Sequence, residues 1–116
     1  MIDKVVSSIV GLGVPGLVLL VAMAASGWAG GAAVVTALAT LGGPAGMIGG
    51  IGLLVVMALI SKALARYGFE RIFVASVRGL REKGISNDEI IRKVEGYPIS
   101  KSIKRRLYDE LKELED

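Results

Sequence analysis

The chain divides into an apolar half and a charged half. No Asp, Glu, Lys, Arg or His occurs from Val5 to Ser61, a run of about 57 residues. A membrane-spanning helix needs about 20 apolar residues, so this run can hold two spans and a connection. The pattern predicts an all-α membrane protein: a two-span, Gly/Ala-rich transmembrane hairpin in residues 1–66, followed by a small cytoplasmic three-helix module in residues 67–116.

The first span is expected at about residues 5–25. Pro15 lies in its first half, and we expect a kink there because Pro is tolerated inside membrane helices. A secretory signal is the alternative, since residues 22–24 (Ala-Met-Ala) fit a small-x-small cleavage site. A secretory signal begins with a positively charged region, and here Asp3 cancels the charge of Lys4.

The second span is expected at about residues 45–65. The apolar connector of residues 26–44 contains a ten-residue core, residues 32–41, that would make only about 15 Å of helix, half the thickness of a bilayer. This core could be an interfacial helix, a re-entrant segment or an extension of the first span. A third span is a further alternative.

Basic residues predict the orientation. They outnumber acidic residues just after the second span, while the connector has none, so the C-terminal module should be cytoplasmic. An even number of spans then places Met1 on the same side of the plasma (inner) membrane. The residues expected at the membrane interface are Trp28, Lys62, Arg66, Tyr67, Phe69 and Arg71.

Glycine is distributed in opposite order in the two spans. It is concentrated early in each, and bulky residues follow, so in an antiparallel hairpin the small half of each helix would face the bulky half of the other. Small residues at four-residue spacing let helix backbones approach closely. The expected helix-packing positions are Gly11, Gly16, Ala29, Ala33 and the zipper of Gly42, Gly46 and Gly50.

The charged half has clear helix boundaries. Apolar residues recur at helical spacing up to Gly84, which ends the first helix. Ser86 and Glu89 form a capping box that begins the second, and Ser100 can cap the third. The first helix could pack on the other two or lie on anionic lipid, because it carries the aromatic residues Phe69 and Phe73 beside basic ones, Arg71, Arg78 and Arg81.

The last helix carries its charges in an order that opposes the helix dipole, with basic residues first and acidic residues last. Head-to-tail contact between copies would use this polarity, and contacts of that kind generate rings or filaments. Local pairs at i and i+4 are the alternative. The expected oligomer or partner contacts are Lys101, Lys104, Arg105, Arg106, Asp109, Glu110 and Glu113.

Several chemistries are excluded by composition. The chain has neither Cys nor His, so the usual zinc, haem and nucleophilic-triad sites cannot form. The predicted spans contain no ionisable group that could relay protons. We therefore expect no enzyme activity, no cofactor and no metal. Two short helices joined by residues 96–98 superficially resemble a helix-turn-helix, but an acidic tail follows, so no nucleic-acid partner is expected.

The architecture favours a non-enzymatic membrane protein. In layout it is similar to phage holins and to the hairpins of pore-forming toxins, while residues 84–89 are similar to the Gly-Ile-Ser-x-x-Glu rhythm of SHOCT-type tail domains. The leading hypothesis is a homo-oligomer in the lipid bilayer that forms a pore or remodels the membrane. The alternative is a membrane anchor or accessory subunit whose C-terminal module recruits a protein partner.

Overall fold

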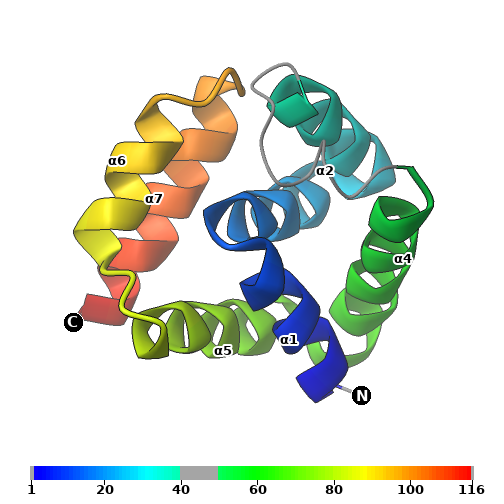
Figure 1. Ribbon diagram of the computed structural model, residues 1–116, viewed down its shortest axis with the longest axis horizontal. Coiled ribbons are helices and arrows are strands. Elements are labelled where there is room, and N and C mark those ends of the chain that lie inside the picture. Colours follow the sequence, from blue (N-terminus) through cyan, green and yellow to red (C-terminus); the bar gives the residue numbers. More distant parts are fainter. Residues whose placement is uncertain (1, 40–49, 116) are drawn as a thin grey trace.

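The computed structural model describes residues 2–39 and 50–115. Within these ranges the chain forms six α-helices and no strand, which confirms the all-helical prediction (Figure 1). The helices are α1 (Ile2–Leu12), α2 (Val14–Ala39), α4 (Gly50–Tyr67), α5 (Phe69–Glu82), α6 (Asn87–Glu95) and α7 (Lys101–Glu115). The predicted zipper positions Gly42 and Gly46, and residues 45–49 of the expected second span, lie outside the described residues.

The first predicted span is not one helix. The chain breaks at Gly13, whose φ of 79° is a left-handed conformation that costs glycine little. The Gly13 N–H donates to the Val10 carbonyl at 3.0 Å and closes the last turn of α1. Pro15 lies in the first turn of α2, where its missing N–H removes no helical hydrogen bond. The expected kink at Pro15 is therefore wrong, because glycine two residues earlier provides the easier place to turn.

Helix α2 bends at a second glycine. Gly27 has φ 66° and ψ −154°, a non-helical conformation that divides α2 into a first half, residues 14–26, and a second half, residues 28–39. Of the interpretations of the connector, an extension of the first apolar helix describes residues 28–39. The direction of the ribbon changes at this point (Figure 1).

Among the described residues, one helix is long and apolar enough to cross a membrane, the stretch Val14–Leu38 of α2. The two-span hairpin is therefore not confirmed, and the membrane topology is not determined.

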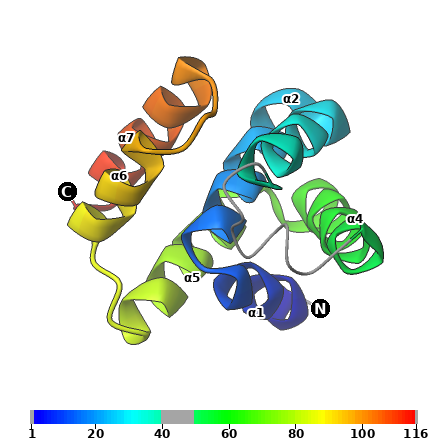
Figure 2. The same ribbon diagram turned by 45° about the horizontal axis from the view of Figure 1, so that its top comes forward.

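The first half of α2 forms the centre of the core. Every residue from Leu17 to Met23 is buried, and this half lies between the other helices in both views (Figures 1 and 2). The Cα radius of gyration is 12.6 Å, close to the value of about 13 Å for a globular domain of this size. The charged half thus packs on the apolar half. Its buried contributions are Ile72, Phe73, Val77, Leu80, Ile90, Val94, Leu107 and Leu111.

The helix boundaries of the charged half agree with the sequence. The Ser86 hydroxyl accepts a hydrogen bond from the Glu89 N–H at 3.2 Å, which confirms the predicted cap of α6. The Ser100 hydroxyl accepts from the Ile103 N–H at 3.4 Å and caps α7. Helix α5 packs chiefly against α1 and α2, while α6 and α7 pack against each other and against α2.

Candidate membrane interface

The outward stripe of α4 changes from apolar to cationic along the helix. Leu54 and Val55 are 53% and 54% exposed, unusually high values for large apolar side chains. The exposed positions of α4, in order, are Leu54, Val55, Ala58, Ser61, Lys62, Ala65 and Arg66. From Leu54 to Arg66 the helix rises about 18 Å, roughly one leaflet of a bilayer.

The second half of α2 continues this uncharged surface. Trp28, the only tryptophan of the chain, is 46% exposed. Gly31 packs closely on α4: a Cβ atom at this position would lie 3.0 Å from Met57 Cε. Among the residues of this half whose burial is described, the other exposed ones are small and uncharged, namely Ala29, Ala32, Ala33 and Thr36, and the exposed Ala25 and Ser26 precede the bend. Helix α4 lies on the side of the molecule away from α6 and α7 (Figures 1 and 2).

The corner between α4 and α5 gathers positive charge around an aromatic ring. The guanidinium carbons of Arg66 and Arg71 lie 5.8 and 5.7 Å from the centroid of the Tyr67 ring. Gly68, with φ 86°, turns the chain here. With the exposed Lys62 nearby on α4, these residues bring three of the predicted interface cations to one end of the apolar stripe.

Phe69 lies differently from the other predicted interface residues. Its ring centroid is 5.2 Å from that of Phe73. The guanidinium carbon of Arg106 also lies 5.2 Å from the Phe69 ring centroid. Phe69 is thus half-buried between α5 and α7 and links these two helices. Phe69 therefore contributes to the packing of α5 against α7 as well as to the molecular surface.

Two cavities lie where α2 meets the C-terminal half. The first, about 390 Å³, opens beside the bend at Gly27, and its lining residues are Met23, Ala24, Gly27, Trp28, Ser61, Leu64, Phe69 and Arg106. The second, about 290 Å³, separates the second half of α2 from the segment between α6 and α7. Its lining residues are Ser26, Gly30, Ala33, Val34, Ala37, Pro98, Ile99, Ser100 and Ile103.

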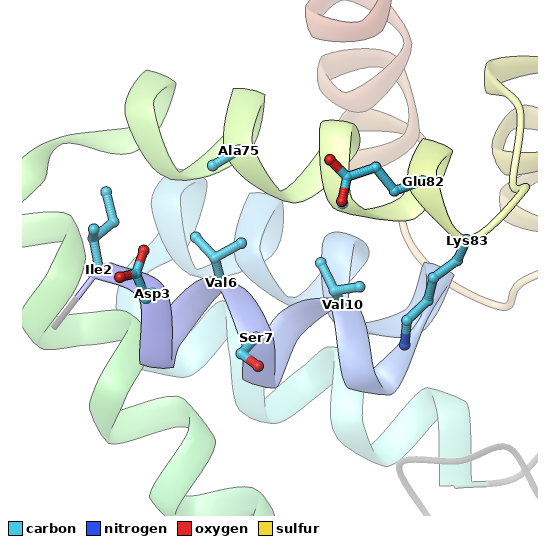
Figure 3. Close-up of a pocket in the computed structure, with 9 residues that line it drawn as sticks. Ile2, Asp3, Val6, Ser7, Val10, Ala75, Glu82 and Lys83 are labelled. Carbon is cyan, nitrogen blue, oxygen red and sulfur yellow. The ribbon is translucent and has the colours of Figure 1, made fainter.

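A third, open cavity of about 510 Å³ runs between α1 and α5 (Figure 3). Val6 and Val10 project from α1 toward α5 along its floor, and Asp3 lies at one end while Glu82 and Lys83 lie at the other. Apolar side chains line most of it, without the convergent polar groups that fix a small ligand.

The predicted packing glycines differ in their surroundings. A Cβ atom at Gly16 would lie 2.2 Å from the Ile9 carbonyl oxygen, so this glycine allows α1 and α2 to meet. Gly11 has open space around it, and Gly50 is the first residue of α4. Ala29 and Ala33 are exposed, the latter at the rim of the second cavity.

Sequence reasoning missed the close contact of α5 with α1. A Cβ atom at Gly79 would lie 2.7 Å from Val10 Cγ2. The available signal was the small pair Ala75 and Gly79, four residues apart on α5, opposite the equally spaced Val6 and Val10. This pair lies in the charged half, outside the apolar run in which small residues indicate helix packing.

The charged residues of α7 fall into two groups. Lys104 donates from Nζ to the Glu95 carbonyl at 3.0 Å, and Arg106 lies over Phe69, so both contact their own chain. The others among the expected partner contacts, apart from the partly buried Glu110, are exposed: Lys101, Arg105, Asp109 and Glu113.

Three carboxylates come together between α5 and α7. In the described part of the chain, Glu70, Glu110 and Glu113 have oxygen atoms within 4.8 Å of one another, and this is the set that could hold a cation. Burial, and then the charges of Glu113 and Glu70, raise the pKa of Glu110 above its ordinary value of 4.5. The cluster therefore weakens the contact of α7 with α5 when all three groups are ionised.

Comparison of the chain with protein-family models, with curated proteins and with solved structures finds no match.

Proposed function

We propose that this protein is a non-enzymatic membrane protein that inserts the uncharged face of α4 and α2 into a lipid bilayer and self-associates there. The observation that carries the proposal is the exposure of three large apolar side chains, Leu54, Val55 and Trp28, on segments of α4 and α2 that contain no charged residue. Exposed apolar surface of this kind marks contact with a membrane or another protein.

The polarity of α4 favours a bilayer as the contacting surface. Leu54 and Val55 would reach the hydrocarbon, while Lys62 and Arg66 would meet lipid phosphates. Trp28 suits the boundary between the two, because its ring is apolar and its N–H is polar. The basic residues after Ser61 support an orientation with the C-terminal helices on the cytoplasmic side of the inner membrane.

Flotation with liposomes tests the insertion. The protein should float with vesicles of neutral and anionic phospholipid, and Leu54→Asp with Val55→Asp should abolish flotation. Ser102→Asp is the control, because Ser102 is exposed on α7, outside both α4 and α2. Retention of flotation by the double variant would contradict the proposal.

Self-association in the membrane would follow from small-residue packing. The expected zipper at Gly42, Gly46 and Gly50 is one contact, and the exposed charges of α7 are a second. A multimer of this type could form a pore or remodel the bilayer. Native mass measurement and dye release from liposomes test this step. Charge reversal at Lys101 and Arg105, which are free of the contacts made by Lys104 and Arg106, should reduce the multimer.

The alternative is a membrane anchor or accessory subunit. Its support is the position of α6 and α7 on the side away from α4, where a protein partner could reach them (Figure 1). A monomer that leaves liposomes sealed and co-purifies in stoichiometric amount with another polypeptide would favour this function over a multimer.

A further inference from the structure

We infer that α2 is a membrane-spanning helix stored in a bent form, and that it straightens at Gly27 when α6 and α7 move away from it at a bilayer. The inference rests on the proposed function and adds the conformational step that would lead from docking to insertion.

The bend interrupts the one segment with the length to span. Val14–Leu38 has 25 residues, which as a straight helix would measure about 37 Å, more than the hydrocarbon thickness of about 30 Å. With Gly27 at φ 66° and ψ −154°, its halves point in different directions. This conformation is essentially restricted to glycine. Apart from its chain neighbours and its own helix, no atom lies within 4 Å of the place that a Cβ at position 27 would occupy, so a side chain there would meet no steric clash.

The two halves of α2 differ in burial. Residues 17–23 are all buried, whereas in the second half exposed positions (28, 29, 32, 33 and 36) alternate with buried ones (30, 31, 34 and 38). In water, the buried half is stabilised by its cover of amphipathic helices. In hydrocarbon this advantage disappears, because lipid tails are as apolar as the core. A bilayer therefore lowers the cost of removing the cover.

Helix α2 is least completely buried along its contact with α7. Both cavities on the surface of α2 lie there, one beside Gly27 and Arg106 and the other facing Ile99 and Ile103. The carboxylates of Glu70, Glu110 and Glu113 also repel one another across the contact of α7 with α5.

The first experiment favours the straight helix by substitution. Gly27→Ala should increase dye release from liposomes about tenfold, because alanine disfavours the bent conformation and favours a continuous helix. Gly84→Ala is the matched control. Like Gly27, Gly84 has a positive φ and open space at its Cβ position, but it lies outside α2. If Gly84→Ala increases release as much, general destabilisation explains the effect and the inference is wrong.

The second experiment prevents the movement. The chain has no cysteine, so Ala33→Cys with Ile99→Cys creates a unique pair across the second cavity. Joining the pair with a bismaleimide should abolish dye release, and brominated acyl chains should still quench Trp28, since docking remains possible. Cross-linking Asp88→Cys with Arg92→Cys, both exposed within α6, should leave release unchanged.

These measurements separate the two proposals. Full dye release by the variant cross-linked between positions 33 and 99 would overturn the straightening of α2 while leaving membrane insertion intact. Absence of flotation and of Trp28 quenching in the unmodified protein would overturn both.

Discussion

Gly79 on α5 packs so closely on Val10 of α1 that a Cβ atom at position 79 would lie 2.7 Å from Val10 Cγ2. This contact joins the first helix of the apolar half to the first helix of the charged half. The valine side chain is branched at Cβ and has little freedom to move aside. The glycine is thus a requirement of the α1–α5 crossing.

Gly79→Ala should lower the free energy of unfolding by about 1 to 2 kcal/mol, because overpacking outweighs the gain in helix propensity. Urea denaturation followed by circular dichroism measures the change. The matched variant is Gly11→Ala, in open space on α1, which should raise stability by about 0.5 to 1 kcal/mol. Equal effects of the two substitutions would contradict the close crossing.

Gly16→Ala should be more damaging than Gly79→Ala. Its Cβ would lie 2.2 Å from the Ile9 carbonyl oxygen, and a backbone atom cannot give way as a side chain can. We expect a loss of more than about 2 kcal/mol, measured in the same denaturation experiment. A variant that stays as stable as the unmodified protein would show that α1 and α2 do not meet at Gly16.

Ser76→Ala should stabilise the protein by about 1 kcal/mol. Ser76 is fully buried on α5, and its hydroxyl has no hydrogen-bond partner among the described residues. Alanine removes this desolvated group and is the better helix former. Ser8→Ala is the comparison, because the Ser8 hydroxyl is bonded to the Lys4 carbonyl at 2.9 Å near the surface. A fall in the thermal midpoint of Ser76→Ala would reveal a partner for the hydroxyl.

The pKa of Glu110 predicts a pH dependence of stability. Because burial and neighbouring carboxylates raise this pKa, the folded protein binds the proton more tightly than the unfolded chain does. Stability should therefore fall as pH rises from 4.5 through the raised pKa. Glu110→Gln should increase the urea midpoint at pH 7 and flatten this part of the profile.

The control for the lost charge at Glu110 is Glu82→Gln, since Glu82 is not among the groups that raise the pKa of Glu110. The argument fails if both variants change the profile between pH 4.5 and 8 in the same way.

Local signals in the sequence predicted the charged half well. The caps at Ser86 and Ser100 are formed by short side chains acting within one turn, so their spacing is sufficient to locate them. The apolar half was harder, because uniformly apolar residues carry no periodicity that marks a buried face. Gly13 and Gly27 therefore resembled the other glycines of the run, although both are points at which the described helices turn.

The candidate membrane interface was predicted in part for a similar reason. The positions of Trp28, Lys62 and Arg66 follow from their location at the ends of apolar stretches, and all three are exposed. Phe69 also lies at the end of an apolar stretch, but its contact with Arg106 forms only because α7 packs near the start of α5. Such tertiary contacts between distant segments have no counterpart in local sequence.

The burial of the first half of α2 also has a consequence for the timing of synthesis. Met23 is made long before Leu111, and about 88 residues of translation separate them, which at 5 to 20 residues per second takes roughly 4 to 18 s. During that interval the apolar segment leaves the ribosome without α7 to cover it. The nascent chain therefore presents its most apolar helix to membranes and chaperones before it can form its own core.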